Sequence, residues 1–448
     1  MTKIALLLSA AALSFPALAA PPPEDVGYAV LEGLTTEIGP RLAATEAEAR
    51  ARDWAVKRLK ALGFANVHIE TYDMPSWERG IGTAEVIAPY PQKLVIAALG
   101  NSGSTPPGGV TAEVVGFPSI EALQAAPESA VKGKIVFVWH RMAVTQDASS
   151  YEANVPVRYA TASIASKKGA VAALVRSIGT DHHRVAHTGV QAWIDGATPI
   201  AAAALSVPDA DQLERMLALG KPVTLHVEVT AHMTGTHQSG NVIAEVPGRD
   251  PKAGIVLIGG HLDSWDLGTG AIDDGAGVAI TTGAAKAMLE GPRPKHTIRL
   301  VWFGAEEPGG FGGKAYAAAH GKEKHILAAE SDLGADRVWS FRLALADPKA
   351  PIITDLSRAL APLGIGFAAG PAFGGTDVEP TGATGVVLMD LVQDATRYFD
   401  IHHTADDTLD KIDRAQFDQN VAAWTAMLKV VTNSDADLTP APGPAPHE

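Results

Sequence analysis

Two adjacent glutamates, Glu306 and Glu307, stand between an apolar run at 297–303 and a glycine-rich stretch, PGGFGG. The run TIRLVWF has the length and composition of a buried strand, so both acids lie where that strand ends. Neighbouring side chains point in different directions, so a site that uses both glutamates must give them different roles.

Histidines and acidic residues also gather near the predicted ends of other strands. The segments are GGHLDSW at 259–265, GAIDDGAG at 270–277, ESD at 330–332 and IHHTADDT at 401–408. In open α/β sheets, sites form at the carboxyl ends of the strands, where loops from distant parts of the chain converge. We therefore expect these segments to share one site with the two glutamates.

Acidic side chains gathered at one sheet edge repel one another unless a cation neutralises them. The chain has no cysteine, so a metal must be held by histidine and carboxylate, a donor set that suits zinc. More carboxylates than one ion needs indicate two ions about 3.5–4 Å apart, bridged by one carboxylate. Cobalt and manganese accept such ligands too, so the sequence leaves the identity of the metal open.

The elements that must position these residues alternate between strands and helices from residue 241 onward. Strands are expected at 254–258, 297–303, 326–329 and 386–391, with helices at 276–289 and 414–431. This order predicts an α/β fold with a mixed, mostly parallel sheet flanked by helices. A helix at 43–62 and a strand at 66–72 come earlier in the chain.

A separate unit interrupts this pattern. The stretch NSGSTPPGG at 101–109 reads as a linker, and strands are expected after it at 134–138, 170–175, 199–205 and 223–230, with a helix at 159–169. We predict an inserted, mainly β domain over residues 101–236. The first and second parts of the main domain are then residues 20–100 and 237–432.

The two ends of the chain have their own patterns. Lys3, an apolar stretch from Ile4 to Leu13 and the small-x-small site Ala17-Leu18-Ala19 predict a signal peptide over residues 1–19, and therefore export to the periplasm or the exterior. The Pro- and Ala-rich residues 433–448 predict a disordered tail. A net charge of −14 argues against a nucleic-acid partner, and no later segment reads as a membrane span.

Taken in order, GHLDSWD, GAIDDGAG, EEPGGFGG, ESD and HHTADDT resemble the signature of the M28 family of co-catalytic zinc aminopeptidases. GGHLDSWDLGTGAIDDGAG and the earlier WERG at 77–80 are most similar to its carboxypeptidase Q branch, which consists of exported dipeptidases. VKGKIVFV, KKGAVAALV and TPIAAAALS resemble a protease-associated (PA) domain in the insert. The resemblance implies a zinc aminopeptidase (phosphorylase/hydrolase-like) fold. One departure is Gly-Gly-Phe after EEP, which puts the pocket shape in doubt and not the ligands.

The resemblance also implies roles for individual residues. His261 and Asp332 would bind one zinc ion, Glu307 and His403 the other, and Asp273 would bridge both. Glu306 would be the general acid/base that moves a proton from the attacking water to the leaving amine. The expected cofactor is therefore two Zn²⁺ per chain.

Four other residues are candidates for supporting the metal ligands or contacting the substrate. Asp263 is expected to hold the second nitrogen of the His261 ring. Asp266 would help bind the amino group of the substrate, Asp377 belongs to a loop that lines the pocket, and His187 of the insert would touch the substrate. Four further residues have simpler interpretations. His402 is expected to be structural, and Asp274 and Asp407 are expected to cap helices. Glu330 is the alternative to Asp332 as a metal ligand.

The expected activity is hydrolysis of the peptide bond after a free N-terminal residue, with dipeptides as the small peptide substrates. The alternatives are a carboxypeptidase-type exopeptidase on the same scaffold and a non-catalytic binding protein. Relatives in this branch often pair, so a homodimer is a further expectation.

Overall fold

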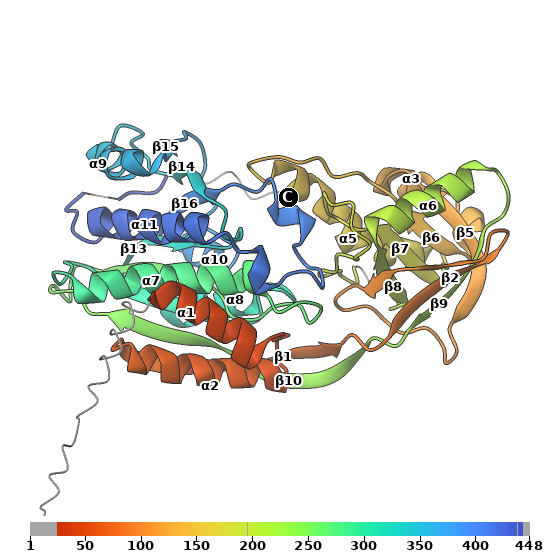
Figure 1. Ribbon diagram of the computed structural model, residues 1–448, viewed down its shortest axis with the longest axis horizontal. Helices are drawn as coiled ribbons and strands as arrows, with labels where there is room; N and C mark the ends of the chain where they lie inside the picture. Colours follow the sequence, from red (N-terminus) through yellow and green to blue (C-terminus); the bar gives the residue numbers. More distant parts are fainter. Residues whose placement is uncertain (1–24, 195, 437, 442–448) are drawn as a thin grey trace, which may run out of the picture.

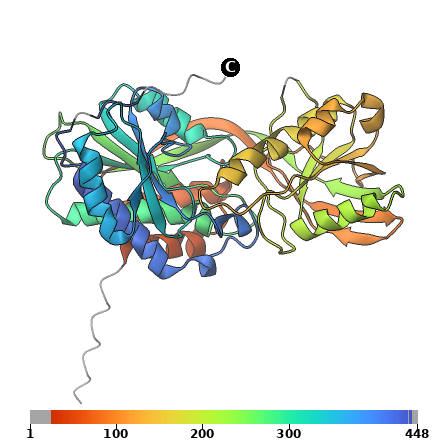
Figure 2. The same ribbon diagram turned by 90° about the horizontal axis from the view of Figure 1, so that it is seen from above.

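The computed structural model describes residues 25–194, 196–436 and 438–441 and has two lobes side by side along its long axis (Figure 1). Each lobe is built around its own eight-stranded sheet. The view from above shows the same two lobes at opposite ends of the molecule (Figure 2). The predicted signal peptide, residues 1–19, lies outside the described residues.

The sheet of the first lobe has the strand order β1-β10-β12-β11-β13-β16-β14-β15. Its central strands β12, β11, β13 and β16 are parallel, while β10 and β14 pair with them antiparallel, which confirms the predicted mixed, mostly parallel sheet. The bounds are β1 Ala65–Glu78, β10 His232–Val246, β11 Ile255–His261, β12 Thr297–Phe303, β13 His325–Glu330, β14 Val338–Leu343, β15 Gly366–Phe367 and β16 Val387–Gln393.

Helices cover both faces of this sheet, because its central strands are apolar on both sides. Along β12, Ile298, Leu300 and Trp302 belong to the large core beneath α7 and α11, while Val301 and Phe303 belong to a smaller core beneath α8. The helices are α1 Val26–Gly33, α2 Glu46–Ala61, α7 Ala276–Glu290, α8 Phe311–His320, α9 Pro351–Leu360, α10 Glu379–Gly382 and α11 Arg414–Val431.

The sheet of the second lobe has the strand order β3-β2-β9-β5-β6-β7-β8-β4. Its last strand, β4, packs beside β2 near its other end, so the sheet curls into a nearly closed barrel. The bounds are β2 Gly82–Ala88, β3 Gln92–Leu94, β4 Ile96–Ala98, β5 Val110–Phe117, β6 Ile135–Val138, β7 Ala172–Arg176, β8 Ala201–Leu205 and β9 Thr224–Val229. Its helices are α3 Ile120–Ala125, α4 Glu128–Val131, α5 Ser149–Lys167 and α6 Val207–Ala218.

The second sheet extends over residues 82–229, whereas the sequence predicted an insert over 101–236. The difference arises because the Gly- and Pro-rich stretch read as a linker is a loop between β4 and β5, inside the sheet. The chain passes between the lobes along the long antiparallel pair of β1 and β10, which runs from Ala65 opposite Glu245 to Glu78 opposite His232 with a register shift near each end (Figure 1).

The chain after α11 returns to the first lobe. In the segment predicted to be disordered, Pro440 forms a bridge with Leu345, and the N–H of Ala346 donates to the carbonyl of Thr439 (3.0 Å). This part is therefore bound to the lobe, while residues 437 and 442–448 lie outside the described residues. Within the described part of the chain, no helix combines the length and apolarity needed to cross a membrane.

Candidate metal centre

The polar segments predicted to converge do so at the carboxyl ends of the parallel strands. His261 is the last residue of β11, Glu307 follows β12, and Asp332 follows β13. Asp273 lies in the loop that enters α7, and His403 lies in the loop that precedes α11. The fold thus brings the five predicted ligands from five separate segments to one edge of the sheet.

Asp273 lies at the centre of this cluster. Its Oδ1 is 3.1 Å from Nε2 of His261, and its Oδ2 is 3.1 Å from Nε2 of His403. The two carboxylate oxygens therefore face different histidines, which is the arrangement expected of a carboxylate shared by two ions.

Each histidine has a further carboxylate beside it. Nε2 of His261 is 3.5 Å from Oδ1 of Asp332, and Nε2 of His403 is 3.0 Å from Oε2 of Glu307. These two distances are compatible with the two ligand groups that the resemblance implies, although Glu307 also lies within one donor group with His261 and Asp273.

The donor atoms fit a cation. Oε1 of Glu307 is buried and has no hydrogen-bond partner among the described residues, whereas Oδ2 of Asp273 is buried with only the rings of His403 (3.1 Å) and His402 (3.4 Å) near it. A buried carboxylate oxygen without a partner is costly, and a divalent ion would satisfy it. Histidine nitrogen with carboxylate oxygen is also the set that zinc accepts.

The electrostatics of the cluster point the same way. Burial raises the pKa of Glu307 and the pKa of Asp332 above their usual values. Burial alone would lower the pKa of His261, but carboxylates headed by Asp332 raise it well above its usual range. For His403 burial likewise lowers the pKa, and Glu307 and Asp273 raise it well above that range. Raised pKa values favour the protonated form of each group, so a cation bound there would compete with protons for these ligands.

The two adjacent glutamates face different partners. Oε2 of Glu307 faces His403, whereas Glu306 is half-buried and lines the central cavity. Burial raises the pKa of Glu306 well above its usual value, and the nearby carboxylates of Asp332 and Glu307 raise it further. A carboxyl group in that position is suited to accept and return a proton near neutral pH.

Asp263 supports this arrangement in a way the sequence did not predict. Nδ1 of His261 is 2.9 Å from the backbone carbonyl of Asp263 and 3.7 Å from Oδ1 of its carboxylate. The carboxylate instead accepts hydrogen bonds from the N–H groups of Glu306 (3.0 Å) and Glu307 (3.3 Å). One residue thus orients a predicted ligand and both glutamates.

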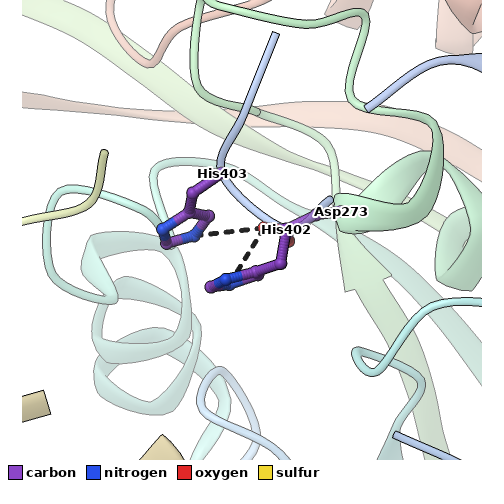
Figure 3. Close-up of side chains that lie close together, drawn as sticks. All are labelled: Asp273, His402 and His403. Atoms are coloured by element: carbon purple, nitrogen blue, oxygen red, sulfur yellow. Dashed lines mark ion pairs between the residues drawn. The ribbon is translucent and has the colours of Figure 1, made fainter. Parts of the chain in front are cut away.

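Asp274 was predicted to be a helix cap and His402 to be structural, but both lie close to the predicted metal ligands. The N-cap of α7 is Gly275 and not Asp274, but Oδ1 of Asp274 accepts from the N–H of Gly277 (2.9 Å) in the first turn, and its Oδ2 accepts from the N–H of His261 (3.0 Å). The ring of His402 stacks on that of His403 with centroids 3.5 Å apart, and its Nε2 is 3.4 Å from Oδ2 of Asp273 (Figure 3). His402 and His403 with Asp273 form a compact donor group, as do Asp274 and Asp332 with His261.

The predicted cap at Asp407 is wrong. Asp413 caps α11, while the carboxylate of Asp407 accepts from the N–H groups of Ala271 and Ile272 (2.7 Å each) and so holds the loop that carries Asp273. The fully buried Arg41, which sequence reasoning missed, donates to the carbonyls of Thr269 (2.7 Å) and Gly270 (2.8 Å) in the same loop. Arg41 is far away in sequence and carries no motif, so only the fold reveals it.

The second lobe contacts this centre through the segment that includes His187. The carbonyl of Thr188 lies 3.2 Å from Nδ1 of His403, and the N–H of Thr188 donates to the carbonyl of His403 (2.9 Å). His187 is buried between the carboxylate of Asp181 (2.8 Å) and the carbonyl of His402 (2.7 Å). His187 therefore contacts the loop that carries His403. It is not among the residues that line the cavity, whereas the sequence predicted that it would touch the substrate.

Asp266 and Asp377, which were predicted to serve the substrate pocket, both have partners within the protein. Asp266 forms an ion pair with Arg79, whose guanidinium also stacks near Trp77 and Trp265. Asp377 is fully buried and accepts from the N–H of Gly313 (2.9 Å) at the start of α8.

Glu330, which the sequence treated as the competitor of Asp332, does line the cavity, and its Oε1 has no partner among the described residues. Burial and the nearby Asp332 raise the pKa of Glu330 to about 8.

A cavity of about 750 Å³ lies over the centre, between the two lobes. Its first-lobe wall carries four of the five predicted ligands (Asp273, Glu307, Asp332 and His403) together with Glu306 and Glu330. Its second-lobe wall carries residues of α5 and the segment after Thr188, namely Tyr151, Arg158 and Val190. The volume is that of a small-molecule site, and the site lies where ligands bind in open α/β sheets.

Comparisons with known proteins show which family and which fold this chain shares. A model described as peptidase family M28 matches residues 241–428. Carboxypeptidase Q of Mus musculus is 35% identical over 420 residues, which cover 93% of this chain and 87% of the relative. The solved structure of a peptidase M28 precursor from Shewanella amazonensis has a TM-score of 0.91 and 45% identity, over 94% of this chain and 96% of that one. A zinc aminopeptidase from Bacillus subtilis, at 20% identity and a TM-score of 0.65 over 92% and 97% of the two chains, shares the fold.

Proposed function

This chain belongs to peptidase family M28 as a homologue of carboxypeptidase Q, and we propose that it is a two-zinc exopeptidase that hydrolyses dipeptides after a free N-terminal residue. The observation that carries the proposal is Asp273, whose two oxygens face His261 and His403 at 3.1 Å each. We also propose that the protein is exported, on the strength of the signal-like residues 1–19.

The ligands of the two ions follow from the two groups around Asp273. His261 and Asp332 would hold one ion, and Glu307 and His403 the other. Zinc ions held there would polarise the scissile carbonyl and lower the pKa of water towards about 7.

Glu306 moves the proton in this proposal. It lies beside the ligand Glu307, lines the cavity and is not needed to complete either metal group. It would accept a proton from the attacking water and return it to the nitrogen of the leaving amine. Asp263 keeps Glu306 and Glu307 at fixed positions through their backbone N–H groups.

A preference for a free N-terminus requires a carboxylate for the substrate ammonium. Asp266 is already paired with Arg79, so it does not supply that group. Glu330 lines the cavity with an unpaired oxygen, and we assign it this role. The second lobe lies over the opposite side of the cavity and would limit the length of the substrate.

The proposal is tested with the purified full-length protein on three matched peptides: a free dipeptide, its N-acetyl form and its C-terminal amide. We expect hydrolysis of the free dipeptide, loss of activity with a chelator, recovery with zinc, and resistance of the N-acetyl form. Activity that survives complete metal removal would overturn the proposal. Cleavage of the N-acetyl peptide in preference to the amide would instead identify a carboxypeptidase-type enzyme.

A further inference from the structure

One charged side chain of the cavity wall has no counterion. Arg158, on α5 of the second lobe, lines the cavity and is only 5% exposed. Its Nε donates to the carbonyl of Val190 (3.3 Å), and its Nη2 donates to the hydroxyl of Tyr151 (3.0 Å). No carboxylate forms an ion pair with it among the described residues, and no partner of its Nη1 occurs there.

The guanidinium is held next to the metal centre. The ring of Tyr151 lies beneath it at 5.6 Å and meets the ring of His402 edge-on with centroids 5.1 Å apart. Gly189 lies against the guanidinium so closely that a Cβ there would overlap its atoms. Because Gly189 follows Thr188, which contacts His403, the position of Arg158 is tied to a predicted metal ligand.

A buried guanidinium without an anion is unfavourable, whereas one that receives a carboxylate makes short, charge-assisted and often bidentate hydrogen bonds. The other charged groups of the cavity are mostly acidic, and all of these acids except Glu152 of α5 lie on the opposite, first-lobe wall. A dipeptide carries an ammonium at one end and a carboxylate at the other, which matches this distribution of charge.

We propose that Arg158 binds the C-terminal carboxylate of the dipeptide and thereby makes the enzyme selective for dipeptides. This inference rests on the proposed function, because it assumes that the substrate lies across the centre with its amino end at Glu330. Arg158 is then the residue that determines specificity, and Tyr151 orients it.

The second arginine of the cavity provides a matched comparison. Arg342 is half-buried on β14 and lies opposite Asp390 in the ladder between β14 and β16, so it already has an acidic neighbour. The proposal assigns the carboxylate to Arg158 and not to Arg342.

The test compares kcat/KM for a free dipeptide, its C-terminal amide and an aminoacyl p-nitroanilide in the zinc-loaded wild type and in Arg158→Gln, Arg158→Lys and Arg342→Gln. The wild type should prefer the dipeptide to the amide. Arg158→Gln should lose this preference by about 30-fold or more, mainly through KM, as expected when one partner of a buried charge pair is removed. Arg158→Lys should keep part of the preference, Arg342→Gln should keep it, and zinc content should not change.

A second readout does not require turnover. Calorimetry on the metal-free protein measures the affinity for a free amino acid, which is the carboxylate-bearing product, and for its amide. The wild type should bind the free amino acid more tightly than the amide, and Arg158→Gln should bind both with equal affinity.

An unchanged dipeptide-to-amide ratio in Arg158→Gln, or a loss of that ratio in Arg342→Gln instead, would overturn the inference while the proposed function stands. Equal loss on all three substrates would also overturn it, since that result indicates a structural role. A zinc-loaded wild type that hydrolyses none of the three would overturn the proposed function itself.

Discussion

The two walls of the cavity differ in how completely their polar groups are paired. On the first-lobe wall, Glu307 and Glu330 each keep a buried carboxylate oxygen without a partner among the described residues. On the second-lobe side, His187 and Thr188 lie outside the cavity lining, and both ring nitrogens of His187 and both backbone groups of Thr188 have partners. The difference indicates that polar groups of the first-lobe wall are available to bind ions or substrate, whereas those on the second-lobe side bind neighbouring residues. Arg158 is the exception on the second-lobe side, because it has no counterion among the described residues.

The largest expected effect is the loss of the shared carboxylate. Asp273→Ala should remove both ions and lower dipeptide hydrolysis by about a thousandfold or more, since each group loses an oxygen and several kcal/mol of charge stabilisation. Metal-to-protein ratios by mass spectrometry, with steady-state kinetics, measure this. A variant that still binds two ions would show that the carboxylate of Asp273 is not shared between them.

Glu306→Gln should leave the metal in place and reduce kcat between about 100-fold and 10,000-fold, the range for loss of a general acid/base. The ratio of zinc to protein should stay at the wild-type value. Near-normal turnover at full metal content would refute the role assigned to Glu306.

Asp263 and Asp266 lie three residues apart, and their Asn variants distinguish a carboxylate that positions the catalytic segment from one that only forms an ion pair. Asp263→Asn should reduce kcat/KM by about 10- to 100-fold, because an amide offers one acceptor where the N–H groups of Glu306 and Glu307 need two. Asp266→Asn is the matched control and should change KM little, because that carboxylate pairs with Arg79. If Asp266→Asn gives the larger defect in KM, the earlier hypothesis that Asp266 binds the substrate amine is correct.

The pH dependence of zinc binding follows from the raised pKa values of His261, His403, Glu307 and Asp332. Their protons must leave before zinc binds, so affinity should fall as the pH falls, by about tenfold per pH unit for each proton displaced. Competition with a chromophoric chelator between pH 6 and pH 8 measures this. An affinity that does not change over that range would contradict the raised pKa values of these groups.

The smallest effect is expected on the second-lobe side. His187→Gln keeps one of two buried hydrogen bonds and should lower the free energy of unfolding by about 1 kcal/mol, with kcat close to the wild type. Chemical denaturation and kinetics on the same preparation measure both. A large fall in kcat with unchanged stability would show that His187 touches the substrate after all.

Sequence patterns predicted the first lobe well, because its buried strands have simple signatures. The strand at 297–303 and the helix at 414–431 have the predicted bounds, since each is a long apolar or amphipathic run with clear ends. The start of the second lobe was missed because the Gly- and Pro-rich stretch at 101–109 was taken as its boundary, whereas β2, β3 and β4 come before that stretch, and β3 and β4 have only three residues each.

At the candidate site, the five predicted ligands could be chosen from the sequence because each belongs to a recognisable motif. The fold then brings them together at the carboxyl ends of the parallel strands. Contacts made through the backbone, such as the carbonyl of Thr188 beside His403, leave no signature in residue type. For the same reason Arg41 and Arg158 were not predicted: their roles depend on which distant loops the fold places around them.

From the contact between Thr188 and His403 we expect the first lobe alone to be an incomplete peptidase. Because β1 and β10 carry the chain out to the second lobe and this contact returns it to the loop that carries His403, excising residues 82–229 would leave His403 without its neighbour. We expect a minimal version made in that way to fold poorly around metal, and laboratory variants with altered selectivity to come from changes in α5 instead.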